Sequence, residues 1–260
     1  MSEDVPFDFS DEEITLLLDN IDEYTPDEVV EIEKMVDELE NRKLNQLAFD
    51  DLIEFCKAMM SDFIVGKHHR ILADMLMAIE RGDKDRVCVN IPPRHGKSQL
   101  VSIFYPAWFL GRNPDKKVMM VSHTSDLAVD FGRKVRNLIA TDAYRAVFPS
   151  VRLAADSKSA GRWNTNVGGE YYATLIDDPH SEQDVINGNF SAFARAYDWY
   201  TFGARTRLMP GGRVAIVQTR WHMDDLTGRV VKDMSQNERA DEFEVVEFPA
   251  ILEVDDKETG

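Results

Sequence analysis

The chain has 260 residues, of which 43% are hydrophobic and 30% are charged, and these proportions are typical of a folded globular protein. Its longest uncharged apolar stretch, residues 99–110, falls short of the ~20 residues that cross a bilayer, and the acidic start at 1–4 lacks the order of a secretory signal. Two cysteines cannot build a disulfide framework. A membrane protein, a small secreted domain and a cysteine-rich zinc protein are therefore excluded.

The net charge of −17 is unevenly distributed: residues 1–66 carry −16, residues 233–260 carry −8, and the middle of the chain carries +7. A basic middle between acidic ends fits a domain that meets polyanions, with flanks for protein partners or solubility. The acidic ends fit solvated helical faces equally well. Charge alone does not decide between these interpretations.

Residues 1–63 are predicted to form an acidic helical segment. The residues at 10–13 and 25–28 each fit a capping box at a helix start, the second with Pro26 at the first helical position. Another helix is predicted over 47–62, and the apolar stripe of residues 68–81 predicts one there.

From residue 86 onward, strand and helix patterns alternate. The predicted strands are 86–91, 117–121, 171–176, 213–218 and 243–248, and the predicted helices between them are 97–110, 125–140 and 190–205. Strands separated by helices imply βαβ units. The sequence therefore predicts an α/β fold with a mostly parallel central sheet flanked by helices.

The most informative segment is Ile-Pro-Pro-Arg-His-Gly-Lys-Ser at 91–98, because a Walker A loop also lies between a strand and a helix. Backbone N–H groups there would bind phosphate oxygens, Lys97 would neutralise β/γ-phosphate charge, and the Ser98 hydroxyl would bind Mg²⁺. Ile91 replaces the first glycine of the usual pattern, and Gly-Lys-Ser also fits an ordinary helix start. The residues expected to bind ATP here are Pro93, Arg94, His95, Gly96, Lys97, Ser98 and Gln99.

An acidic pair, Asp177 and Asp178, follows the predicted strand 171–176. A phosphate loop needs a carboxylate at the end of an adjacent strand, so Asp177 would hold the Mg²⁺ shell together with Ser98. Asp178 would orient or deprotonate the attacking water. Arg94 would stabilise γ-phosphate charge or pair with a neighbouring acid. Asp178, Arg94 and Lys97 are thus the predicted catalytic residues, although Asp-Asp-Pro is also good turn chemistry.

Other motifs follow in order: Tyr-Pro-Ala-Trp at 105–108, Gly-Arg-Asn-Pro at 111–114, Asp-Asp-Pro-His at 177–180 and Gln-Thr-Arg-Trp-His at 218–222. Together with the 91–98 segment they resemble the ATPase domain of a tailed-bacteriophage terminase large subunit, the motor that packages double-stranded DNA. The resemblance covers about residues 64–252. It implies a P-loop NTPase that uses ATP and Mg²⁺ in the host cytoplasm during virion assembly. The partners it implies are double-stranded DNA, a portal protein, the small terminase subunit and further copies in a ring, expected to be a pentamer.

The resemblance also implies roles for residues outside the loop. His69, with its neighbours His68 and Arg70, lies where such motors contact the nucleotide base. The run Gln218-Thr219-Arg220 lies in the position of a coupling motif that senses the γ-phosphate and relays it to DNA movement. A structural histidine and a hydrogen-bond network of a loop are the alternatives. After Arg94, the remaining candidates for an arginine finger are Arg133, Arg136, Arg205 and Arg220. Asp224 and Asp225, which with His222 could be taken for a metal site, are interpreted as the start of a helix.

Two features depart from the family. Its C-terminal nuclease domain is expected to be absent here, with residues 64–250 as the ATPase domain and 251–260 as the start of a linker. Relatives have a Gly-rich segment of about a dozen residues before the acidic strand, a loop that could contact nucleotide. Here Tyr172 runs almost directly to Leu175, which indicates either a deletion or two pieces joined across a loop. Two other functions stay open: a helicase-like DNA-remodelling ATPase, and an adaptor that binds nucleotide without turnover.

Overall fold

The computed structural model describes residues 15–16, 18–122, 125–157, 159–175 and 185–249. The chain divides into two compact units, residues 1–47 and residues 48–260. The predicted helix start at 10–13 lies outside the described residues. None of the described helices is both long enough and apolar enough to cross a membrane.

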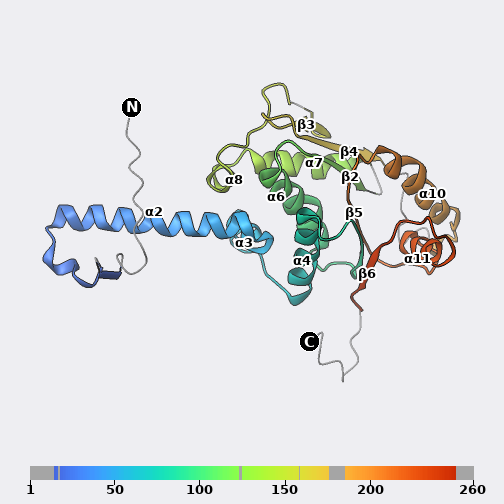
Figure 1. Ribbon diagram of the computed structural model, residues 1–260, viewed down its shortest axis with the longest axis horizontal. Helices are drawn as coiled ribbons and strands as arrows, with labels where there is room; N and C mark the ends of the chain where they lie inside the picture. Colours follow the sequence, from blue (N-terminus) through green and yellow to red (C-terminus); the bar gives the residue numbers. More distant parts are fainter. Residues whose placement is uncertain (1–14, 17, 123–124, 158, 176–184, 250–260) are drawn as a thin grey trace, which may run out of the picture. The chain divides into compact units, whose positions relative to one another are not determined.

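The first unit is helical, with η1 (Ile21–Glu23) followed by most of α2 (Pro26–Asp50) (Figure 1). The capping box predicted at 25–28 is confirmed, because the Glu28 carboxylate accepts hydrogen bonds from the Thr25 N–H at 2.8 Å and from the Thr25 hydroxyl at 2.7 Å. The helix predicted over 47–62 is wrong in its bounds. A new helix starts after Asp51, whose carboxylate accepts hydrogen bonds from the N–H groups of Ile53 and Glu54.

The second unit alternates helices and strands, as predicted. In chain order they are α3 (Leu52–Met59), α4 (Lys67–Arg81), β1 (Arg86–Asn90), α5 (Lys97–Gln99), η2 (Leu100–Phe104), α6 (Tyr105–Arg112), β2 (Lys117–Ser122), α7 (Ser125–Ile139), α8 (Asp142–Val147), β3 (Arg162–Asn164), β4 (Glu170–Leu175), α10 (Ser191–Trp199), η3 (Tyr200–Ala204), η4 (Arg205–Arg207), β5 (Val214–Gln218), α11 (Leu226–Gln236) and β6 (Glu244–Glu247). Every predicted strand is present with small shifts at its ends. The sequence analysis missed α8 and β3.

The described strands form two small sheets, where one central sheet was predicted. Sheet A has the order β5–β1–β6 and is parallel throughout. Sheet B has the order β2–β4–β3, with β2 and β4 parallel and β3 antiparallel to β4. All six residues of β4 pair with β2, from Lys117↔Glu170 to Ser122↔Leu175. The strand before the acidic pair is therefore bonded to β2 and β3, and the expectation that it would lie beside β1 is not met.

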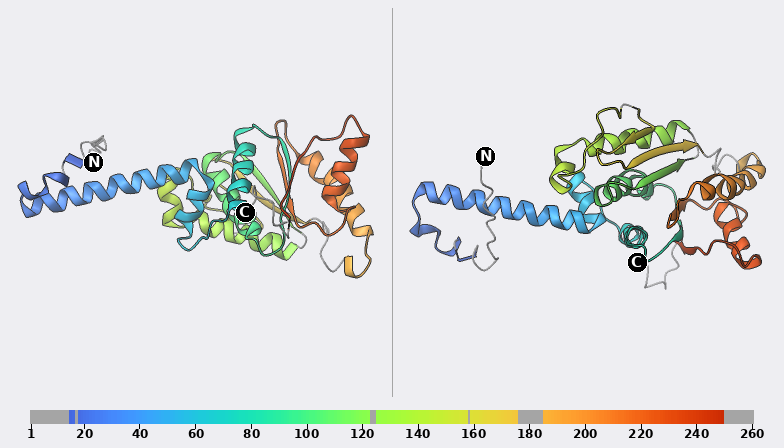
Figure 2. Two further views of the ribbon diagram at one scale, coloured as in Figure 1. Left: turned by 90° about the horizontal axis from the view of Figure 1, so that it is seen from below. Right: turned by 45° about the horizontal axis from the view of Figure 1, so that its top comes forward.

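Helices cover both faces of sheet A, and the left view of Figure 2 shows its strands between α4 on one side and α10 with α11 on the other. Successive side chains of a strand point to opposite faces. Val87 and Val89 accordingly join the main core with α3, α4 and α6, whereas Cys88 joins a smaller cluster with Leu226 and Val230 of α11. The central strand β1 is thus buried on both faces, as is usual in a parallel sheet.

The helix after β1 is continuous from Lys97 to Arg112, because the residues at both internal junctions keep right-handed helical angles. Its second part, η2, is a π-helical turn. Pro106 has no N–H and cannot donate to the preceding turn, and a π-turn is one way for a helix to accommodate this. The long helix points its N-terminus at the loop that follows β1.

Candidate functional site

The loop at residues 91–98, called the 91–98 loop below, joins β1 to the helix that begins at Lys97, as predicted. Arg94 has a φ of 66° and Gly96 a φ of 70°, and Arg94 is the only non-glycine residue with a positive φ in the described part of the chain. Residues of positive and negative φ therefore alternate from Arg94 to Lys97. Such alternation turns successive N–H groups toward one side and makes a concave nest that binds anions.

Two histidines of α4, His68 and His69, form hydrogen bonds to the backbone of this loop. The buried His69 accepts a hydrogen bond from the Gly66 N–H at Nδ1, so its Nε2–H donates to the carbonyl oxygen of His95 at 3.0 Å. His68 reaches the same oxygen at 3.1 Å. A Cβ atom at Gly96 would lie 2.6 Å from Nε2 of His69, so only glycine fits there. Burial, followed by the neighbouring His68, lowers the pKa of His69.

This geometry bears on the expected role of His69 as a contact of the nucleotide base. Both of its ring nitrogens are used within the protein. The imidazole is therefore built to support the loop, and any influence on a ligand would pass through the loop backbone.

The cationic and hydroxyl groups of the loop differ in how they are held. Lys97 is half-buried, its Nζ donates to the Thr219 hydroxyl at 2.6 Å, and burial lowers its pKa. Within the described part of the chain, the exposed side chains of Arg94 and Ser98 have no hydrogen bond or ion pair. The loop thus presents one held cation, one exposed cation and one exposed hydroxyl beside a helix N-terminus.

Three polar residues lie side by side at the carboxyl end of sheet A, where β1 leads into the loop. The strand registers align Asn90 with Gln218 on one side and with Glu247 on the other. Gln218 donates to the Thr227 hydroxyl of α11 at 2.8 Å, and that hydroxyl donates to the Asn90 side-chain oxygen at 3.0 Å. The Gln218 side chain therefore faces α11. Its side-chain oxygen is buried without a hydrogen-bond partner among the described residues.

The arginine candidates separate clearly. Arg220 pairs with Asp225 at 2.8 Å and with Glu247 at 2.6 Å, Arg133 pairs with Asp130 and Arg205 with Asp241. Arg136 also has an interaction within the chain. Among these candidates in the described part of the chain, Arg94 is left as the unpaired one.

The helix start at Asp224 and Asp225 is confirmed. The fully buried Asp225 caps α11 by accepting a hydrogen bond from the Gly228 N–H at 3.0 Å. In the regions that the structure covers, no group of three or more His, Cys, Asp or Glu side chains is arranged to hold a metal ion. The predicted metal ligand Asp177 and the predicted base Asp178 lie outside the described residues.

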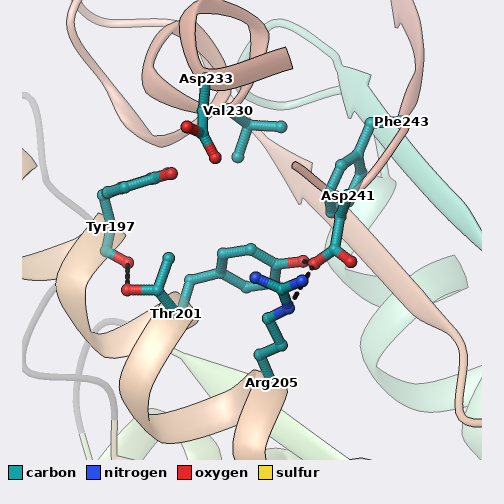
Figure 3. Close-up of a pocket in the computed structure, with 8 residues that line it drawn as sticks. Tyr197, Thr201, Arg205, Val230, Asp233, Asp241 and Phe243 are labelled. Atoms are coloured by element: carbon teal, nitrogen blue, oxygen red, sulfur yellow. Dashed lines mark hydrogen bonds and ion pairs between the residues drawn. The ribbon is translucent and has the colours of Figure 1, made fainter. Parts of the chain in front are cut away.

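A second hollow, between α10–η3 and α11, offers little to a ligand (Figure 3). Two of its charged groups are paired with each other, since Arg205 lies 3.1 Å from the Asp241 carboxylate, which also accepts a hydrogen bond from Tyr200 at 2.6 Å. Burial and the nearby Asp233 raise the pKa of Tyr197 to about 12, so that this phenol stays neutral. The lining residues are Tyr197, Tyr200, Thr201, Arg205, Val230, Asp233, Asp241 and Phe243.

Thr219 belongs to the predicted coupling motif at 218–220, but its contacts with Lys97 and Ile91 were not predicted. Successive residues of an extended segment face opposite sides. Since Gln218 faces α11, Thr219 faces the loop and meets Lys97. The alternation along the strand 213–218 was the signal that could have identified it.

Comparison with models of known protein families finds no match for the chain, and comparison with curated proteins finds no matching sequence either.

Proposed function

We propose that the chain is the ATP-hydrolysing motor domain of a viral large terminase, which drives double-stranded DNA into a procapsid, and that it has a P-loop NTPase fold. The observation that carries the proposal is the geometry of the 91–98 loop. Its alternating backbone, the helix that begins at Lys97 and the side chains of Lys97, Arg94 and Ser98 form one anion-binding arrangement. The resemblance of the ordered motifs supplies the identity of the motor.

The loop residues would bind the triphosphate of ATP. Backbone N–H groups from Arg94 to Ser98 would bind phosphate oxygens, and Lys97 would place its charge against the β- and γ-phosphates. The exposed Ser98 hydroxyl, with Asp177, would hold Mg²⁺, whose charge offsets that of the phosphates. The fit is supported by the exposed hydroxyl and by the absence of any carboxylate paired with Lys97 among the described residues.

Hydrolysis would be in-line attack by water on the γ-phosphorus. A bond forms between the water oxygen and phosphorus, the bond to the β–γ bridging oxygen breaks, and the proton of the water passes to Asp178. Arg94 would meet the charge that develops on the γ-phosphate oxygens, because it is exposed beside the loop and unpaired in the described part of the chain.

The basic middle of the chain would meet the DNA backbone, which predicts strong salt dependence and little sequence preference. In this proposal the domain acts in the host cytoplasm, as a ring of copies, expected to be a pentamer, on the portal protein. The small terminase subunit is the further partner, and a nuclease domain belongs to the full-length protein.

One observation favours a second candidate, a domain that binds ATP without turning it over. The strand that leads toward the acidic pair, β4, belongs to sheet B and has no bond to β1. In this alternative the chain would act as a nucleotide-dependent adaptor. Turnover separates the two candidates.

The test measures ATP binding by calorimetry and phosphate release, with and without duplex DNA, for the wild type, Lys97→Ala and Lys116→Ala. Lys116 is the matched control, because it is an exposed lysine paired only with Asp115. We expect Lys97→Ala to weaken ATP binding at least about a hundredfold, since several charge-assisted bonds are lost. Binding without phosphate release would favour the adaptor. No ATP binding by the wild type, or equal binding by the Lys97 variant, would overturn the proposal.

A further inference from the structure

Thr219 contacts both ends of the 91–98 loop, Ile91 at its start and Lys97 near its end. It directly follows β5, which pairs with β1 up to Asn90↔Gln218, and the pairing continues when the Ile91 N–H donates to the Gln218 carbonyl at 3.0 Å. The Thr219 hydroxyl then donates to the Ile91 carbonyl at 3.1 Å. Both backbone groups of the first loop residue are therefore fixed by two successive residues of one neighbouring segment.

The same hydroxyl also holds the lysine of the loop. Nζ of Lys97 donates to Oγ1 of Thr219 at 2.6 Å. Because the hydroxyl proton is already directed at Ile91, Thr219 can only accept from the ammonium group. The three groups form a chain of hydrogen bonds with one direction, from Lys97 through Thr219 to Ile91, and such chains strengthen each member.

The chemistry of this acceptor suits a lysine that must receive an anion. A carboxylate would bind the ammonium group through a charge-assisted bond, about twice as strong as a neutral one, and would compete with a phosphate. A hydroxyl is neutral, and it uses only one of the three N–H donors of Lys97. Two donors stay available while the first keeps the side chain in place.

We propose that Thr219 is a positioning residue of the 91–98 loop, which fixes the loop at Ile91 and holds the ammonium group of Lys97 in place for a polyphosphate. The inference rests on the proposed nucleotide-binding function and gives Thr219 a role different from the γ-phosphate sensing expected of its motif. Thr219 acts through Lys97 and the loop backbone, so its loss weakens binding without removing any charge.

The experiment compares Thr219→Val, which keeps the shape and removes the hydroxyl, with Thr219→Ser, which keeps the hydroxyl. Thr201→Val is the matched control, because the Thr201 hydroxyl is also half-buried and bonds only to carbonyl groups of its own helix. Binding of a non-hydrolysable ATP analogue with Mg²⁺ is measured by calorimetry, and thermal melting of each variant reports folding. We expect Thr219→Val to bind about tenfold more weakly, and Thr219→Ser and Thr201→Val to bind like the wild type.

The outcomes distinguish a failure of this inference from a failure of the proposed nucleotide-binding function. Suppose that the wild type binds the analogue and Lys97→Ala does not. The positioning role is then wrong if Thr219→Val binds as tightly as the wild type, or if Thr219→Ser binds as weakly as Thr219→Val. In either case the proposed nucleotide site is unaffected. If the wild type itself does not bind the analogue, the proposed function is wrong, and the inference is overturned with it.

Discussion

Sheet A and sheet B are both three-stranded sheets that contain a parallel strand pair, yet they contribute differently to the candidate site. Sheet A ends in an aligned polar row and continues directly into the 91–98 loop. Sheet B contains a β-hairpin: β4 pairs with the antiparallel β3 on one side and with the parallel β2 on the other. The phosphate-binding half of the proposed site is thus assembled on sheet A. The strand that leads toward the acidic half lies in sheet B.

The difference shows how local and non-local information act in this chain. The loop geometry follows from a short segment with its own glycine, lysine and helix start. The position of an acidic pair beside that loop depends on which strand neighbours which. Among the described strands, residues 170–175 pair with β2 on one edge, residues 170–172 pair with β3 on the other, and neither edge is bonded to sheet A.

The largest effect is expected at Arg94. An L-residue at a φ of 66° is strained, so Arg94→Gly removes the charge and the strain together. We expect turnover to fall about a thousandfold, the lower end of what such arginines contribute. The free energy of unfolding should be unchanged or higher by up to ~1 kcal/mol. Phosphate-release assays and chemical denaturation measure the two quantities.

Arg133→Ala is the control for Arg94→Gly, because Arg133 is exposed and already paired with Asp130. Turnover of Arg94→Gly equal to that of this control would assign Arg94 a role outside catalysis. A clear loss of stability in Arg94→Gly would mean that the side chain has a partner in the folded protein.

The next effect concerns the stability of sheet B. Trp163 of β3 is 1% exposed, stacks on Tyr171 with ring centres 4.9 Å apart, and donates from Nε1 to the Gly132 carbonyl. Trp163→Ala should lower the free energy of unfolding by about 3 kcal/mol or more, and Trp163→Phe by less, because the second keeps an aromatic ring. The folded fraction of both should bind ATP with wild-type affinity.

Val89→Ala sharpens this comparison, since Val89 is a fully buried residue of β1, the strand that leads into the 91–98 loop. We expect its cavity to weaken both stability and ATP binding. If Trp163→Phe also weakens binding in the folded protein, sheet B takes part in the nucleotide site, and the contrast between the two sheets does not hold.

Much of this architecture could be predicted from the sequence, because the strands and helices have distinct apolar periods. The capping box at Thr25 and the helix start at Asp225 follow from local side-chain chemistry and were predicted. The short strand β3 was missed since its pairing depends on β4, which comes later in the chain. The alternation along the strand 213–218 indicates the side to which Thr219 points, but its contact with Lys97 also depends on the register between β1 and β5, which no local pattern fixes.

The smallest expected effect is a pH dependence of the free energy of unfolding that comes from His69. This residue supports the 91–98 loop, which continues from sheet A. Its folded pKa lies below the ordinary value, chiefly through burial, so the neutral form is the one that the fold favours. Protonation would also place a proton on Nδ1, which now accepts from the Gly66 N–H. The stabilisation is therefore complete above the unfolded pKa of about 6.5 and is lost as the pH falls through the folded value. We expect the free energy of unfolding to decline less between pH 7.5 and 5 in His69→Gln than in the wild type, by chemical denaturation at each pH. Equal slopes in the two proteins would mean that His69 contributes nothing to this decline.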